Sequence, residues 1–144
     1  MYDSVLLATD GSGDRRAIRH ALDLAEQHAA TVHVLYVIDI VQSGPGIIGR
    51  TRATSTRSTL RDEGQEALRA IRTAARRRGI SVVTEIREGI PTREIRAYGD
   101  EAGVDLLILS PHGRTGFDRL LQGSVTEQVL RRTDQPVLAI QKGT

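Results

Sequence analysis

The stretch LLILSPHG, residues 106–113, followed after nine residues by Gly123-Ser124-Val125, decides how this chain is expected to fold. Its first four residues form an apolar run typical of a buried strand. The glycine-punctuated loop after it leads into a helix-like segment, residues 124–132. Such a loop suits an anion, because its backbone N–H groups point inward and the helix N-terminus carries partial positive charge. The stretch therefore predicts a phosphate-binding strand, loop and helix.

The rest of the chain alternates between strand-like and helix-like segments. Strands are expected at 4–9, 31–38, 81–87, 105–109 and 136–141, and helices at 15–28, 58–78, 91–102 and 124–132. Three arginines followed by Gly79 indicate a helix end with a left-handed glycine cap, and Pro91 suits the first turn of a helix. Residues 39–56 are rich in Gly, Ser, Thr and Arg and have no period, so a loop is expected there.

Strands that alternate with crossover helices imply an α/β fold with one parallel, five-stranded sheet and helices on both faces. The default doubly wound strand order is 3-2-1-4-5, within a single domain covering residues 1–144. Ligands of such sheets bind beyond the carboxyl ends of the strands where the order reverses, here between the first and fourth strands. Asp10 follows the first strand and Ser110 follows the fourth, so these two segments are expected to meet in one site.

Composition narrows the classes of function. The 144-residue chain has no cysteine, which excludes disulfides, thiolate catalysis and cysteine-based metal sites. It has no apolar run of the ~20 residues that a bilayer span needs, and its start lacks the basic residues of a signal peptide, so a cytoplasmic protein with no membrane association is expected. Residues 50–96 hold twelve arginines against six acidic residues, but the net charge of the chain is only +2. A solvated arginine-rich face is expected there, and nucleic-acid binding is the less favoured interpretation.

Five residues are the strongest candidates for contact with an anionic ligand. Gly113 and Gly123 let a phosphate approach the backbone, although both also suit simple turns. Ser124 can cap the following helix and contact the same phosphate. Asp10 suits a ribose hydroxyl or a divalent metal such as Mg²⁺, or alternatively the cap of the next helix. Arg114 can reach phosphate oxygens, or it is a loop arginine without a role.

Several motifs together resemble the universal stress protein family over essentially the whole chain. They are Ala8-Thr9-Asp10-Gly11-Ser12, Tyr36-Val37-Ile38-Asp39, Gly89-x-Pro91 and the loop 110–125. The nucleotide-binding branch of that family carries G-x-x-G, nine residues, then G-[ST]. This chain keeps the spacing but has Ser110 where the first glycine stands. Serine is tolerated there if only small size is needed, and hinders binding if the position needs a positive φ or contact with a phosphate.

The resemblance implies an ATP-binding, Rossmann-like, flavodoxin-type domain that forms homodimers. Carried over by position, Ala8 and Thr9 flank the nucleotide, and Asp10 meets the ribose or Mg²⁺. Val37 meets adenine through its backbone. The path of the adenosine and phosphates is lined by Leu109, Ser110 and Gly113, and the phosphates are held by Gly123, Ser124 and Val125. The last strand, Val137 to Ile140, is implied to pair across the dimer, and as an exposed edge it also invites a partner strand.

Four functions remain open from the sequence. The leading one is a stress-response module that ATP regulates, since the sequence shows no Walker lysine and no evident general base. The others are a slow ATPase or phosphotransferase using Asp10 and Mg²⁺, a dimeric interaction module that binds no nucleotide, and nucleic-acid binding. In a further hypothesis, the segment 40–56 lies over the nucleotide, where Arg50, Arg52 and Arg57 screen phosphate charge.

Overall fold

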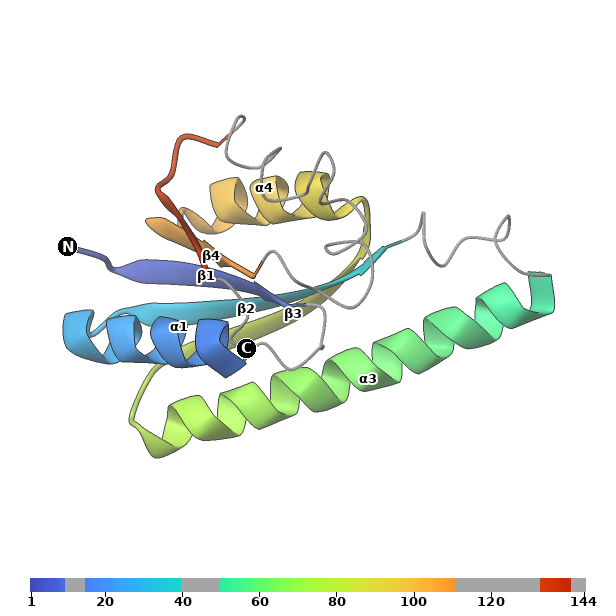
Figure 1. The fold of residues 1–144 in the computed structure, drawn as a ribbon, viewed down its shortest axis with the longest axis horizontal. Coiled ribbons are helices and arrows are strands. Elements are labelled where there is room, and N and C mark those ends of the chain that lie inside the picture. Colours follow the sequence, from blue (N-terminus) through green and yellow to red (C-terminus); the bar gives the residue numbers. More distant parts are fainter. Residues whose placement is uncertain (10–14, 40–49, 111–132, 141–144) are drawn as a thin grey trace.

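The computed structural model describes residues 1–9, 15–39, 50–110 and 133–140, with residues 50–57 described as helix backbone. Eight elements follow one another along these residues (Figure 1). They are β1 (Ser4–Thr9), α1 (Arg15–His28), β2 (Thr31–Asp39), α3 (Arg50–Arg77), β3 (Val82–Gly89), α4 (Pro91–Ala102), β4 (Leu106–Leu109) and β5 (Val137–Ala139).

The five strands form one sheet in the order β3-β2-β1-β4-β5, and every neighbouring pair is parallel. The strand order predicted from the sequence is therefore confirmed. β1 is the central strand, and Val5 pairs with Val32 on one side and Leu106 on the other. Because β2 and β4 lie on opposite sides of β1, the chain reverses its direction across the sheet at β1, which makes the carboxyl end of β1 the topological switch point.

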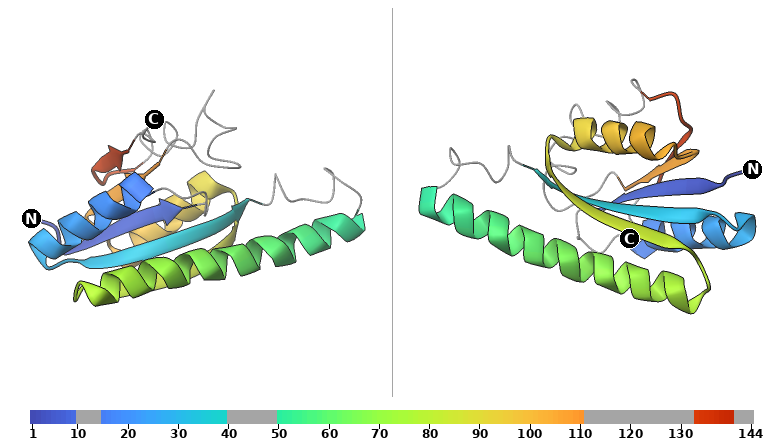
Figure 2. Two further views of the ribbon diagram at one scale, coloured as in Figure 1. Left: turned by 60° about the horizontal axis from the view of Figure 1, so that its bottom comes forward. Right: turned by 180° about the vertical axis from the view of Figure 1, so that it is seen from behind.

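Helices cover both faces of the sheet, as predicted: α1 and α3 lie on one face and α4 lies on the other (Figures 1 and 2). Alternate strand residues supply the two cores, since successive side chains point to opposite faces. Under α1 and α3, strand residues such as Val34 and Ile108 pack with Ala21 and Ile71. Under α4, a smaller cluster joins Leu6, Leu35 and Leu107 to residues of α4.

Two helix boundaries behave as the sequence predicts. The last turn of α3 carries basic residues, and Gly79 follows it with a φ of 71°. Pro91 lies in the first turn of α4, where its missing N–H costs nothing. α4 ends at Gly103, which has a φ of 63° and donates its N–H to the C=O of Gly99. These left-handed positions favour glycine because it has no Cβ.

The predicted loop at 39–56 is wrong at both of its ends. Asp39 ends β2, and α3 begins at Arg50, eight residues before the predicted start. No glycine or proline lies between Arg50 and Glu63. A helix nucleated by its packed carboxyl-terminal half therefore extends at little cost per residue, even through a polar segment without periodicity. Arg50, Arg52 and Arg57 belong to a helix that projects past the carboxyl ends of the strands (Figure 1).

Other boundaries differ by one to three residues. β3 runs two residues further than predicted, to Gly89, and α3 ends at Arg77 rather than at residue 78. β5 covers Val137–Ala139 within the predicted strand 136–141. The rest of the loop at 40–49 and the helix predicted at 124–132 lie outside the described residues.

Candidate functional site

Three buried polar residues lie at the carboxyl ends of the three central strands. Thr9 ends β1, Asp39 ends β2, and Ser110 directly follows β4. Their exposed fractions are 2%, 5% and 4%, and the only other buried polar residue in the described part of the chain is Thr92. Polar residues are rarely buried without a reason, so their concentration at the switch point marks this end of the sheet as the candidate site.

The central strand is shorter than its neighbour β2, which leaves part of the β2 backbone beyond its end. The last residue pair between them is Thr9 with Tyr36, whereas β2 stays paired with β3 as far as Asp39. Thr31 of β2 turns its backbone toward β1, since its N–H donates to the C=O of Asp3 at 2.9 Å. Every second residue of a strand turns its backbone to the same side, so Val37 also faces β1. Because the pairing with β1 is described only as far as Thr9, the C=O of Val37 lies beyond the last described pair.

The side chains of three predicted site residues are buried in the apolar core. Ala8, Val37 and Leu109 belong to the apolar cluster under α4, with exposed fractions of 0%, 6% and 2%. A ligand at the carboxyl end of the sheet would therefore meet these residues through their backbone.

The structure settles one of the two steric questions raised by Ser110. Among non-glycine residues in the described part of the chain, only Ala29 has a positive φ. Ser110 thus has a backbone conformation open to any L-residue, and its side chain is small and buried. The need for a positive φ is therefore no objection to serine at this position.

The other predicted ligand residues are not brought together by the described structure. Asp10, Gly113, Arg114, Gly123, Ser124 and Val125 all lie outside the described residues. Within the described ranges there is no group of three or more His, Asp or Glu side chains that could hold a metal ion. At the far side of the sheet, β5 pairs with β4 along one edge and is the last strand in the order.

A polar network fastens α4 to β3 and β2. The guanidinium of Arg87 on β3 bonds Glu85 and Glu101, the latter at 2.9 Å, and lies 3.8 Å from a carboxylate oxygen of Glu94. The hydrogen bonds that Arg87 donates to Glu101 and Glu85 raise its pKa, so it stays charged. The same guanidinium stacks 5.0 Å from the centre of the Tyr98 ring.

Tyr98 extends this network to β2. Its hydroxyl lies 2.7 Å from Nδ1 of His33, and the two rings meet edge to face. Burial lowers the pKa of His33, because an imidazolium would lose its hydration there. Burial also raises the pKa of Tyr98. α4, which starts beside the carboxyl end of the sheet, is thus held to β2 and β3 by directional contacts as well as by apolar packing.

Comparison with known proteins identifies the family. The sequence profile of the Universal stress protein family matches residues 1–141. The chain belongs to the universal stress protein family. Universal stress protein MJ0531 of Methanocaldococcus jannaschii is 34% identical over 143 residues, which cover 99% of this chain and 84% of that protein.

Solved structures agree with this assignment. The structure of hypothetical protein MJ0577, from the same organism, matches this universal stress protein with a TM-score of 0.81 and 27% identity, covering 100% of this chain and 99% of that one. A universal stress protein solved in complex with cAMP shares the fold, with a TM-score of 0.70, 22% identity, and coverage of 99% and 98%. Across the described ranges of this universal stress protein, the helices lack the length of apolar sequence that a bilayer span requires.

Sequence reasoning gave no separate role to two residues of this universal stress protein that shape the site. Asp39 places a buried carboxylate at the end of β2, and its signal was a charged residue closing the β-branched run TVHVLYVID. Gly89 ends β3, and a Cβ there would lie 2.6 Å from Oε2 of Glu94. The Glu94 side chain of α4 therefore packs directly over this glycine, a contact that no sequence pattern reveals.

Proposed function

We propose that this universal stress protein binds ATP at the carboxyl end of β1, between β2 and β4, and that the bound nucleotide regulates the protein. The observation that carries the proposal is the arrangement at the switch point. Thr9, Asp39 and Ser110 are buried there together, and the C=O of Val37 faces past the end of the central strand. Parallel sheets bind nucleotides at this position, because strand ends and helix N-termini present backbone groups to the ligand.

Each part of the nucleotide has a partner in this proposal. The C=O of Val37 accepts a hydrogen bond from the 6-amino group of adenine. Asp10 meets the ribose hydroxyls or a Mg²⁺ ion that accompanies the phosphates. Gly113 and the run Gly123-Ser124-Val125 supply backbone N–H groups to the phosphates, and Arg114 adds a guanidinium.

Two further features belong to the same proposal. A homodimer forms through the open edge of β5, in the segment Val137 to Ile140, because an unpaired strand edge is a template for a second strand. The protein acts in the cytoplasm. The fold neighbour solved with cAMP supports an adenine nucleotide as the class of ligand.

The base contact gives a sharp test. Inosine triphosphate differs from ATP by a 6-oxo group in place of the 6-amino group, so it would set one carbonyl oxygen against another at Val37. We expect it to bind at least tenfold more weakly than ATP, since a buried polar group left without a partner costs about 1–3 kcal/mol. Equal affinities for the two nucleotides would contradict the placement of adenine beside Val37.

The phosphate contacts are tested by substitution. Gly123→Val adds a side chain where the proposed site needs bare backbone, and we expect it to abolish ATP binding while circular dichroism shows an unchanged fold. Gly99→Ala in α4, away from the site, is the matched control and should bind as the wild type does. Unchanged ATP affinity in Gly123→Val would reject the phosphate site.

A further inference from the structure

A groove runs between α3 and β3 on the side of the sheet away from β5. Its volume is about 480 Å³. One wall is α3, which contributes Arg61, Arg69 and Arg72, and the other is the β3 segment from Thr84 to Ile86. Consecutive residues of a strand point to opposite faces, so a groove that touches all three follows the edge of the strand rather than one face. Among the described strands, β3 is the terminal one and pairs only with β2, so its other edge is open to this groove.

The open edge presents backbone hydrogen-bonding groups to the groove. The N–H of Val32 on β2 donates to the C=O of Ser81 at 2.8 Å. Odd-numbered residues of β3 therefore turn their backbone toward β2, and the alternate residues Thr84 and Ile86 turn theirs outward. In the described part of the chain no strand pairs with them on that side. An N–H and C=O row of this kind matches the backbone of an extended peptide.

The groove is also positively charged. Arg61, Arg69 and Arg72 face a single carboxylate among the lining residues, Glu85, which is already bonded by Arg87. Arg61 and Arg69 pair with Glu88 and Glu66 outside the groove. These side chains of Arg61 and Arg69 are 47% and 64% exposed, so their ion pairs are weak and exchange readily for another carboxylate.

Arg72 completes the charge pattern. Among the residues that the structure describes, no carboxylate forms a salt bridge with Arg72. From Arg61 to Arg72 the helix rises roughly 16 Å, at about 1.5 Å per residue. About five residues of extended chain span the same length at ~3.3 Å each. Carboxylates at alternate positions of such a segment would all point to one side, toward the arginines.

We infer that this groove is a docking site for an extended, acidic segment of a partner protein, which adds as a further strand along β3. The backbone of the segment pairs with Thr84 and Ile86, and its carboxylates meet the arginines of α3. A second copy of this chain is disfavoured, because two such edges would bring their arginines together. A nucleic acid satisfies the arginines but not the backbone groups of β3. The inference does not depend on the nucleotide site proposed at the carboxyl end of β1.

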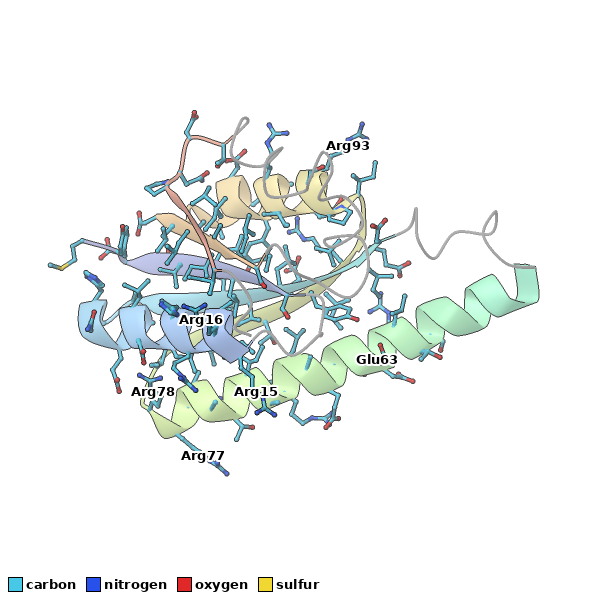
Figure 3. All side chains as sticks on the ribbon, in the orientation of Figure 1. Arg15, Arg16, Glu63, Arg77, Arg78 and Arg93 are labelled. Atoms are coloured by element: carbon cyan, nitrogen blue, oxygen red, sulfur yellow. The ribbon has the colours of Figure 1, made fainter. Side chains whose placement is uncertain are left out.

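The test uses the full chain and a fluorescein-labelled nine-residue peptide that alternates threonine and glutamate, followed by fluorescence anisotropy. We expect saturable binding that Arg69→Glu with Arg72→Glu weakens at least tenfold. Arg93→Glu, a single charge reversal elsewhere on the surface, is the control, because Arg93 is exposed on α4, far from α3 (Figure 3). It should change the affinity less than twofold. Amide hydrogen exchange at Thr84 and Ile86 should slow when the peptide is bound.

Two comparison ligands separate strand pairing from charge attraction alone. The same peptide N-methylated at alternate amides keeps its charge but cannot pair as a strand, and we expect it to bind at least tenfold more weakly. Equal binding of the methylated peptide, or equal losses in Arg93→Glu and the α3 variant, would overturn the inference. Tighter binding of a nine-nucleotide single-stranded oligothymidylate, lost in the α3 variant, would overturn it in favour of a nucleic-acid site. No binding of the acidic peptide at millimolar concentration would also overturn it.

Discussion

Replacing Gly64 by alanine places a methyl group against the ring of Tyr36. Gly64 is buried in the middle of α3, where the helix crosses β2, and Tyr36 is only 2% exposed. A Cβ at Gly64 would lie 2.7 Å from Cδ1 and 2.8 Å from Cε1 of that ring. Real Cβ atoms do not approach ring carbons so closely, so either α3 or Tyr36 must shift.

Two opposing contributions, helix propensity and overpacking, decide whether Gly64→Ala raises or lowers the free energy of unfolding. Alanine is favoured over glycine inside a helix by about 1 kcal/mol. Overpacking a tight core costs about 1–3 kcal/mol. We expect Gly64→Ala to lower the free energy of unfolding by about 1 kcal/mol. Gly99→Ala in α4 is the matched control, because its Cβ would meet Leu107 at an ordinary 3.5 Å. It should gain the helix term alone and raise stability by about 0.5–1 kcal/mol.

Urea unfolding followed by far-ultraviolet circular dichroism measures both variants at one protein concentration, without nucleotide. The two midpoints should move in opposite directions from the wild type. At roughly 3–4 °C per kcal/mol for a domain of this size, melting temperatures should show the same split. If Gly64→Ala is stabilised as much as Gly99→Ala, the close packing of α3 on Tyr36 is refuted.

Three further predictions follow from the network beside α4 and from the site. Arg87→Met should lower the free energy of unfolding by about 1 kcal/mol and reduce its dependence on salt, measured by urea unfolding at low and high NaCl, because the lost ion pairs are partly exposed. Burial lowers the pKa of His33, so below about pH 6.5 the unfolded chain binds more protons than the folded one. The free energy of unfolding therefore falls as the pH falls through that range. His33→Gln should flatten this pH dependence in urea titrations across pH 5 to 7, and an unchanged slope would assign it to other groups. Ser110→Gly should leave the ATP affinity within about twofold in calorimetry, because Ser110 does not need a positive φ; a tenfold gain would show that serine hinders the phosphate.

The sheet was predictable because its signals are local and repeated. The central strands carry apolar runs, as in Val5 to Ala8, and several helix ends carry a marker, such as Gly79 or Pro91. Parallel order then follows from the alternation of strands and helices, since few crossovers are physically allowed. The start of α3 was not predictable, because the sequence of its first turns is polar and has no apolar period, and their helical state depends on the packed turns that follow.

The site was predictable only in outline. The switch-point argument places Asp10 and Ser110 at one end of the sheet; Ser110 directly follows β4 there, and Asp10 lies outside the described residues. It could not reveal that Val37 extends past the end of β1, because the relative lengths of neighbouring strands depend on register rather than on composition. The contact between Gly89 and Glu94 was hidden for the same reason: it joins a strand end to a helix turn through their packing.

The most direct test of the central claim is calorimetric titration of the nucleotide-free protein with ATP and Mg²⁺. The proposed site predicts one nucleotide per chain, with a dissociation constant in the micromolar range, or roughly −8 kcal/mol. Absence of binding heat, together with an unchanged melting temperature in millimolar ATP, would contradict it. The buried polar residues at the end of β1 would then be structural.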